Sequence, residues 1–370
     1  MAIAYQSPLP APYPTLSESQ MRARIQAVRN HFGNKLVILA HHYQRPEIVE
    51  LSDIRGDSLQ LAQYAAKQSE ADFIVFCGVH FMAEGADILK TGNQIVVLPD
   101  LGAGCDMADM ADADDVIEAW EQLVEILEHD NIMPVTYVNS SAALKAFVAS
   151  KGGVICTSSN ATKIVDWALQ EKKVLFFYPD QHLGRNTAKK LGIPLDEMNL
   201  WNPKKNYGGL SKDKIRSTKV MLWEGCCPVH MMFSAKQIDA IRTKDPEFKI
   251  ISHPECAMEV VDKSDCAGST DFIVKTIAAS PAGSKWAVGT ELNLVNRIAK
   301  ENPDKTIVSI NPFMCLCGTM NRIDLPHLTW ALEQIQQGTP QNIIQVHEPN
   351  RSLAKLALER MLEMSRTSSK

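Results

Sequence analysis

The chain lacks a long apolar run, an excess of basic residues and a secretory leader. No apolar stretch approaches the roughly 20 residues that a membrane-spanning helix needs. Segment 1–21 is rich in Pro and Ser without the basic start or apolar core of a signal peptide, and we expect a mobile arm. A formal net charge of −5 without a basic stripe argues against a nucleic-acid-binding surface. These absences predict a cytoplasmic protein that binds neither nucleic acid nor a membrane.

Cysteine pairs at Cys-x₂₋₄-Cys spacing are also missing, although the chain contains nine cysteines. Structural zinc sites use Cys-x₂₋₄-Cys pairs and ferredoxin clusters use Cys-x₂-Cys-x₂-Cys runs, so neither standard arrangement is expected. The reducing cytoplasm argues against disulfides as well. A single cysteine is most often a small buried apolar residue, and Cys77 and Cys156, which lie in apolar runs, fit that interpretation.

What the chain does contain is an alternation of apolar runs and helical patterns. Its 370 residues, 45% hydrophobic and 22% charged, suit two or three soluble domains. The runs are short and mostly apolar throughout, which is typical of parallel strands covered on both faces. They read KLVILA, DFIVFC, QIVVLP, MPVTYV, GVIC, KVLFFY, KVMLW, FKIIS, WAVG and TIVSI. The alternation from residue 35 to about 310 predicts an α/β fold with several βαβ units.

Three of the expected helices begin with small hydroxyl residues after a strand and a loop. These starts lie near Ser58, Ser158 and Ser269, at intervals of roughly 100 residues. One such start is ordinarily an N-cap. Three at a regular spacing favour anion binding, because the free N–H groups and the dipole of a helix N-terminus attract carboxylate or phosphate.

Loop cysteines follow the same spacing. Cys105 follows QIVVLP, the pair Cys226 and Cys227 follows KVMLW, and Cys315 and Cys317 follow TIVSI. The pattern indicates three similar α/β units that each offer a loop cysteine and a helix N-terminus toward a common centre. We attribute the longer first interval to an insertion at about 181–217, whose Trp, Pro and Gly content suits an excursion outside the core.

Three thiolates around one site suit zinc or an iron–sulfur cluster. Structural zinc prefers four closed ligands. A cluster held by only three cysteines leaves one iron open, and an open iron is a Lewis acid that can bind substrate oxygen. The spacing therefore predicts non-redox chemistry on a polyanionic small molecule.

Ten motifs occur in order over nearly the whole chain after the arm: LAHHYQ (39–44), GDSLQLA (56–62), PDLGAGCDMAD (99–109), YVNSSA (137–142), CTSSNA (156–161), PDQHLGRN (179–186), GCCPVH (225–230), HPEC (253–256), AGST (267–270) and CLCGTMNRIDLPHL (315–328). Together they resemble the quinolinate synthase family, the iron–sulfur enzymes of bacterial NAD biosynthesis. A shared fold alone would not supply so many matches in order.

The resemblance implies three related α/β domains around a pseudo-threefold axis, with a central [4Fe–4S] cluster that binds one cysteine from each domain. The expected ranges are 22–119, 120–234 and 235–347, followed by a C-terminal helix at 348–370 that packs back on the body. Cys105 resembles the first ligand. The family pattern Cys-x-Val-His selects Cys227 over Cys226, and Cys-x-x-Met selects Cys317 over Cys315. One iron of the cluster would remain open.

The resemblance also implies the reaction. A quinolinate synthase is a transferase that joins iminoaspartate to dihydroxyacetone phosphate and releases quinolinate, phosphate and water, with the open iron as a Lewis acid. An aspartate oxidase or dehydrogenase would supply the imine transiently. Enolisation, dehydration and ring closure each need acid–base help.

Site residues follow from the same motifs. Proton transfer is expected from Tyr43, Glu255 and His253. The other residues expected to bind or position substrate, with His253 and Glu255, are His41, Ser58, Tyr137, Asn139, Ser158, Ser269 and Thr270.

Two other functions use a three-cysteine cluster. An aconitase-like hydratase also needs an open iron, although it needs neither three anion sites nor a triose phosphate. A non-enzymatic iron–sulfur sensor needs only the ligands, and the surplus of proton-transfer and anion-binding residues speaks against it.

Overall fold

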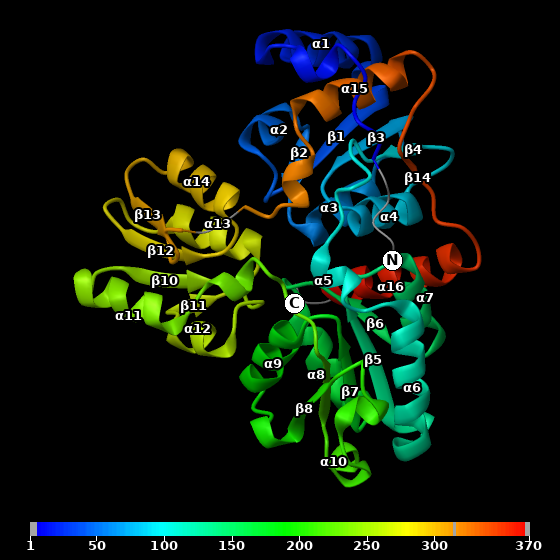
Figure 1. The fold of residues 1–370 in the computed structure, drawn as a ribbon, viewed down its shortest axis with the longest axis vertical. Helices are drawn as coiled ribbons and strands as arrows, with labels where there is room; N and C mark the ends of the chain where they lie inside the picture. Colours follow the sequence, from blue (N-terminus) through cyan, green and yellow to red (C-terminus); the bar gives the residue numbers. More distant parts are fainter. Residues whose placement is uncertain (1–5, 314–315, 367–370) are drawn as a thin grey trace. The chain divides into compact units, whose positions relative to one another are not determined.

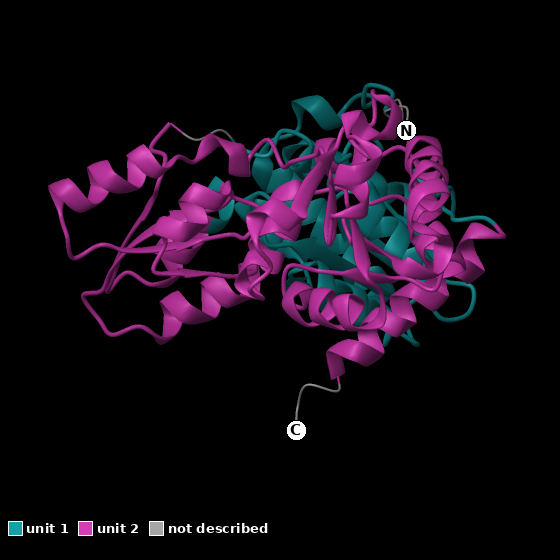
Figure 2. Cartoon of the chain, turned by 90° about the horizontal axis from the view of Figure 1, so that it is seen from below, with its two compact units in different colours: residues 1–105, 292–294, 315–347 teal, residues 106–291, 295–314, 348–370 magenta. Residues whose placement is uncertain are grey.

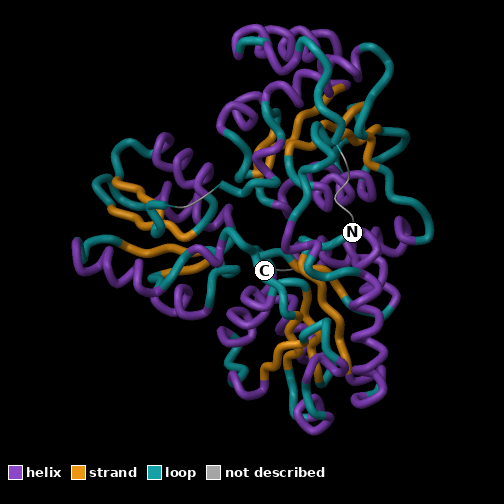
Figure 3. The backbone as a smooth tube through the Cα atoms, viewed as in Figure 1, coloured by secondary structure: helices purple, strands orange, loops and turns teal. Residues whose placement is uncertain are grey.

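The computed structural model describes residues 6–313 and 316–366, so Cys315 lies outside the described residues. The chain divides into two compact units, coloured separately in Figure 2. Unit 1 comprises residues 1–105, 292–294 and 315–347, and unit 2 comprises residues 106–291, 295–314 and 348–370. Three sheets built from parallel strands lie among helices (Figures 1 and 3), and this confirms the α/β class.

Unit 1 contains a five-stranded sheet in the order β14-β4-β3-β1-β2. The strands are β1 (Leu36–His41), β2 (Ile54–Gly56), β3 (Phe73–Cys77), β4 (Ile95–Val97) and β14 (Ile343–Ile344), of which only β14 runs antiparallel. All six residues of β1 are buried, as its continuous apolar run predicts. The helices of this unit are α1 (Glu18–Phe32), α2 (Pro46–Leu51), α3 (Ser58–Ala65), α4 (His80–Leu89) and α15 (Leu325–Gln336).

The N-terminal segment makes specific contacts from Gln6 onward. The Tyr13 ring is buried, and its hydroxyl donates to Glu333 Oε2 at 2.6 Å. Gln6 Oε1 accepts a hydrogen bond from the Leu101 amide at 3.1 Å. A capping box between Ser17 and Gln20 then starts α1.

Unit 2 holds the other two sheets. One has the order β6-β5-β7-β9-β8, with β5 (Ile132–Tyr137), β6 (Val154–Cys156), β7 (Val174–Tyr178), β8 (Met198–Trp201) and β9 (Val220–Trp223). The other has the order β11-β10-β12-β13, with β10 (Lys249–Ser252), β11 (Cys266–Ala267), β12 (Lys285–Gly289) and β13 (Thr306–Ser309). All pairings within both sheets are parallel.

Helices surround these two sheets. They are α5 (Asp106–Asp109), α6 (Ala113–Leu127), α7 (Ala142–Ser150), α8 (Ala161–Glu171), α9 (Gln181–Lys190), α10 (Lys212–Arg216), α11 (Ala235–Lys244), α12 (Met258–Lys263), α13 (Thr270–Ala279), α14 (Leu292–Glu301) and α16 (Asn350–Arg366). The C-terminal helix α16 packs against α7 and β6. Within the described ranges, no helix combines the length and apolar character that a bilayer crossing requires.

Segment 181–217, to which we assign an insertion, contributes a strand to the sheet of unit 2. Its strand β8 pairs with β9 along Met198–Trp201 and forms one edge of the sheet. The side chain of Trp201 is buried in the same hydrophobic cluster as Trp223 and Phe176. The sequence pattern did not predict β8, because polar and Gly-rich residues surround this short strand. Its C-terminal residue, Trp201, packs in the core.

Elements that are far apart in the sequence pack together in unit 1. α15 packs against α1, and β14 extends the first sheet through β4, although both lie within the expected third domain at 235–347. Helix α6 spans the expected boundary at 119, and its residues Val116, Trp120 and Leu123 belong to the core of the sheet in unit 2. Amphipathic helices take the partner that covers their apolar stripe, wherever it lies in the sequence.

Candidate active site

Loops that follow parallel strands bring side chains of unit 2 together. Tyr137 is the last residue of β5, Cys227 follows β9, and Glu255 follows β10. The carboxyl ends of parallel strands are the usual position of functional groups in α/β folds. These three residues come from two sheets and are far apart in sequence, yet they meet around the carboxylate of Glu255.

Glu255 is the centre of this group, with 4% of its surface exposed. The Tyr137 hydroxyl donates to its Oε1 at 2.6 Å. His230 Nδ1 lies 2.9 Å from its Oε2, and His253 Nδ1 lies 3.7 Å from its Oε1. Both carboxylate oxygens therefore have partners, as a buried carboxylate requires.

His230 was not assigned a role by the sequence analysis. It begins the 3₁₀ helix His230–Met232, is 1% exposed, and its Nε2 lies 3.3 Å from Thr290 Oγ1. Its ring stacks on that of His253, with centroids 4.7 Å apart and an interplanar angle of 22°. The sequence feature that could have identified His230 is its position three residues after Cys227 in GCCPVH. A histidine close to a proposed ligand cysteine is a candidate for the same site.

The electrostatics of the site favour an ionised Glu255. Burial acts to raise its pKa, but the charges of His253 and His230 and the hydrogen bonds from His230 and Tyr137 outweigh burial and lower the pKa to about 2. Asp180 behaves in the opposite way. Its complete burial, and then the charge of Glu255, raise the Asp180 pKa well above its ordinary value. Glu255 is therefore ionised at neutral pH.

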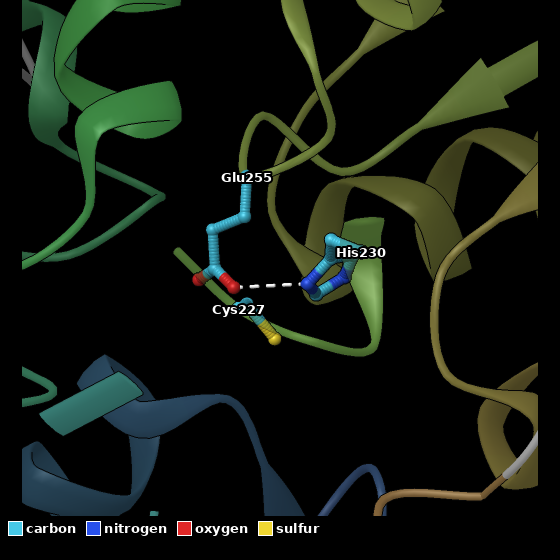
Figure 4. Close-up of side chains that lie close together, drawn as sticks. All are labelled: Cys227, His230 and Glu255. Atoms are coloured by element: carbon cyan, nitrogen blue, oxygen red, sulfur yellow. Dashed lines mark ion pairs between the residues drawn. The ribbon is translucent and has the colours of Figure 1, made fainter. Parts of the chain in front are cut away.

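Cys227, His230 and Glu255 offer one ligand atom each, and these atoms lie within 4.8 Å of one another (Figure 4). A thiol, an imidazole and a carboxylate are a donor set that binds zinc-class metal ions. Cys227 is partly exposed, as a thiol must be to receive a metal. By contrast, burial raises the pKa of the Cys77, Cys156 and Cys256 thiols, which suits inert core residues.

A cavity of about 700 Å³ also lies within unit 2. Ser158 lies in the turn before α8, and Ser269 is the N-cap of α13, where its hydroxyl accepts from the Phe272 amide at 3.3 Å. Both serines line the cavity, and the buried Thr270 begins α13 beside it. Its other lining residues are Ser159, Ala161, Thr162, Leu183, Asn186, Thr187, Lys189, Lys190, Pro254, Val261, Asp262, Ala267, Gly268, Asp271, Phe272 and Lys275.

Asn139 lies in the loop after β5, two residues beyond Tyr137. Its Oδ1 is buried and has no hydrogen-bond partner among residues 6–313 and 316–366. The loop is held by Lys145, a fully buried lysine whose Nζ donates to the Ser140 carbonyl. A buried acceptor held in place in this way is suited to a ligand with a hydrogen-bond donor.

In unit 1, two expected site residues meet at the end of β1. His41 is the last residue of that strand and is buried, and the Tyr43 amide donates to its Nδ1 at 3.2 Å. Their rings lie edge to face with centroids 4.9 Å apart. Ser58 is the first residue of α3, but the N-cap is Asp57, which accepts from the Gln60 amide at 2.8 Å.

The other two expected cluster ligands also belong to unit 1. Cys105 lies between β4 and α5, and Cys317 precedes the 3₁₀ helix Met320–Arg322. Both are partly exposed, as Cys227 is in unit 2. Cys226 and Cys266 are partly exposed as well.

The fold and this site define an α/β enzyme in which a carboxylate, two histidines, a tyrosine and a partly exposed thiol meet at strand ends. A profile of the family described as "Quinolinate synthetase A protein" matches residues 23–363. The chain belongs to this family, the quinolinate synthases.

Curated relatives agree with the profile. The chain is 55% identical over 354 residues to the quinolinate synthase of Anoxybacillus flavithermus, covering 96% of each protein. It is 54% identical over 355 residues to that of Bacillus cereus strain Q1, again covering 96% of each. It is 55% identical over 363 residues to that of Listeria innocua, covering 97% of this chain and 98% of the relative.

Proposed function

We propose that this enzyme condenses iminoaspartate with dihydroxyacetone phosphate to quinolinate, phosphate and water, the C–C bond-forming step of de novo NAD biosynthesis. The observation that carries the proposal is the buried Glu255 carboxylate between Tyr137 and His230, in a chain of this family. An aspartate oxidase or dehydrogenase would supply the imine.

Cys105, Cys227 and Cys317 would hold a [4Fe–4S] cluster with one open iron. The cluster would supply Lewis-acid chemistry when bound, polarising a substrate hydroxyl or carbonyl. The donor chemistry supports this assignment, because all three thiols are partly exposed and in loops. With one ligand cysteine assigned to each, the ranges 22–119, 120–234 and 235–347 remain our proposal for the three family domains.

Glu255 would accept protons during enolisation and ring closure, because its lowered pKa keeps it ionised at neutral pH. His253 would exchange protons with it from 3.7 Å, and the Tyr137 hydroxyl would hold its Oε1 in position. The buried Oδ1 of Asn139 would accept a hydrogen bond from the intermediate. In unit 1, Tyr43 would be the second proton-transfer group, beside His41.

The substrates carry two carboxylates and a phosphate, which need cationic or N–H-rich surroundings. Ser158, Ser269 and Thr270 lie at helix starts, and the first two line the cavity of unit 2. Lys190 lines the same cavity and adds positive charge, whereas the cavity-lining Lys189 and Lys275 are paired with Asp262 and Asp271. Ser58, at the start of α3, and His41 would bind anionic groups in unit 1.

The test is an anaerobic assay of the cluster-loaded protein with the triose phosphate and an aspartate-derived imine, followed by the absorbance of the pyridine product. We expect a brown protein with about four irons per chain that forms quinolinate. A cluster-loaded protein that hydrates a tricarboxylate but forms no pyridine would support the hydratase, and one with neither activity would support the sensor.

A further inference from the structure

The side chains of Cys227, His230 and Glu255 form a compact set of metal donors that does not depend on any residue of unit 1. Tetrahedral zinc places neighbouring nitrogen, oxygen and sulfur ligands roughly 3.3–3.7 Å apart, given metal–ligand bonds of about 2.0–2.3 Å. The observed donors span separations from 2.9 Å, between His230 Nδ1 and Glu255 Oε2, to at most 4.8 Å. Small side-chain rotations bring them within that range.

Each of the two buried ligands already has an outer partner that would orient it. His230 presents Nδ1 to Glu255, while its Nε2 lies 3.3 Å from Thr290 Oγ1. Glu255 presents Oε2 to His230, while its Oε1 accepts from the Tyr137 hydroxyl. Metal-binding histidines and carboxylates characteristically have such partners on the side away from the metal.

The charge and accessibility of the set also suit a divalent cation. A thiolate, a carboxylate and a neutral imidazole carry two negative charges, which balance a 2+ ion at a site where an uncompensated charge would be costly. His230 and Glu255 are 1% and 4% exposed, whereas Cys227 is partly exposed and provides an entry side. Three protein ligands leave a fourth position open for water.

We propose that Cys227, His230 and Glu255 form a mononuclear site for a zinc-class divalent metal ion in the protein that lacks its iron–sulfur cluster. Because Cys227 cannot serve both metals, occupation of this site competes with cluster assembly. The competition rests on the function proposed above, whereas the metal site itself rests only on the geometry of unit 2.

The test uses the full chain stripped of metal under anaerobic, reducing conditions and titrated with Co²⁺, which is coloured in zinc sites. We expect about one cobalt per chain, with visible absorption of a four-coordinate ion and a thiolate-to-cobalt charge-transfer band. Cys227→Ser should remove that band, while the matched control Cys226→Ser keeps it. A band that survives Cys227→Ser, or is lost in Cys105→Ser, overturns the proposal.

Two further variants keep the test decisive if Cys227→Ser does not fold. Thr290→Val, which removes an outer partner, should weaken cobalt binding by about 10–100-fold, and Glu255→Gln, which alters a ligand, should weaken it by more than that. Cobalt affinity unchanged in Glu255→Gln would exclude the carboxylate as a ligand and overturn the site.

Competition is measured as iron uptake by protein preloaded with one equivalent of Zn²⁺. We expect preloading with zinc to reduce the amount of iron bound on reconstitution. In Glu255→Gln, iron uptake after preloading should recover most of its normal level, because this variant binds zinc more weakly. Full iron uptake in the preloaded protein overturns the competition. If the protein takes up no cluster even in the absence of zinc, the proposed function is contradicted. The proposal of a mononuclear metal site is then still judged by the cobalt titration alone.

Discussion

Arg322 Nε lies 3.0 Å from Oδ2 of Asp100, a side chain that is 1% exposed, and this ion pair joins the two cysteine loops of unit 1. Asp100 begins the loop that ends at Cys105, and Arg322 ends the 3₁₀ helix that follows Cys317. The Gly102 amide donates to Asp100 Oδ1 at 2.7 Å, so the same carboxylate also shapes its own loop. The pair thus positions two proposed cluster ligands.

Replacing Arg322 by Gln should loosen both loops, because it leaves the buried Asp100 with only the more distant His327, whose Nε2 lies 3.5 Å from Asp100 Oδ2. We expect a loss of about 1 kcal/mol in the free energy of unfolding, since Arg322 is half-exposed, and faster loss of iron to a chelator. The measurements are urea denaturation of the metal-free protein and the rate of iron release. The control is Arg216→Gln, which removes an exposed ion pair with Asp213 and should change neither.

A glycine substitution tests the same contact without altering charge. A Cβ on Gly102 would lie 2.5 Å from Arg322 Nε, so Gly102→Ala should displace the guanidinium and also speed iron release. Gly85→Ala in α4 meets no atom within 4 Å and serves as the control. Iron release at the wild-type rate in Gly102→Ala would show that the ion pair does not hold the ligands.

The assignment of the cluster ligands predicts a clear division among the cysteines. Cys105→Ser, Cys227→Ser and Cys317→Ser should each abolish cluster retention, because each removes one of only three thiolates. Cys77→Ser and Cys156→Ser should leave the iron content intact, since both thiols are fully buried in strands. The measurement is iron and sulfide content after anaerobic reconstitution. If Cys227→Ser kept its full iron content and Cys226→Ser lost its iron, Cys226 rather than Cys227 would be the cluster ligand.

Glu255→Gln should retain the cluster and bind substrates, yet stall during turnover. The amide preserves shape and can still contact Tyr137 and His230, but it cannot accept a proton, so kcat should fall by about 10²–10⁴. The measurement is single-turnover product formation alongside the electron paramagnetic resonance spectrum of the reduced cluster. Wild-type turnover in this variant would remove Glu255 from the catalytic groups.

Stability should fall on acidification in part because of His182. Burial first, and then the charge of Arg185, lower its pKa from 6.5 to about 4. Between these values the unfolded chain binds more protons than the folded one, so this contribution destabilises the protein as pH falls from about 6.5 toward 4 and levels off below. We expect His182→Gln to narrow the difference between urea midpoints at pH 7 and pH 5. An unchanged difference would contradict the buried, neutral state of His182.

The apolar runs by themselves determined ten of the strands among the described residues, and the α/β class. Each of the ten predicted runs contains a strand, because a stretch such as LVILA is stable only when it is covered on both faces. The strands that were not predicted are β2, β8, β11 and β14, which have two to four residues each. Such short strands carry little periodic signal and form because a neighbouring strand offers unpaired backbone groups.

Only the tertiary structure decided which functional groups meet. The motifs identified Tyr137, Glu255 and His253 as site residues. However, the hydrogen bond between Tyr137 and Glu255 joins residues 118 positions apart, and a local sequence pattern does not predict contacts over such a separation. His230 acquires its role only because β9 and β10 end at the same place. Likewise, Asp100 and Arg322 are 222 positions apart, and their pairing depends on the packing of 315–347 into unit 1. Local sequence sets which elements form, whereas the burial of their apolar faces sets which of them become neighbours.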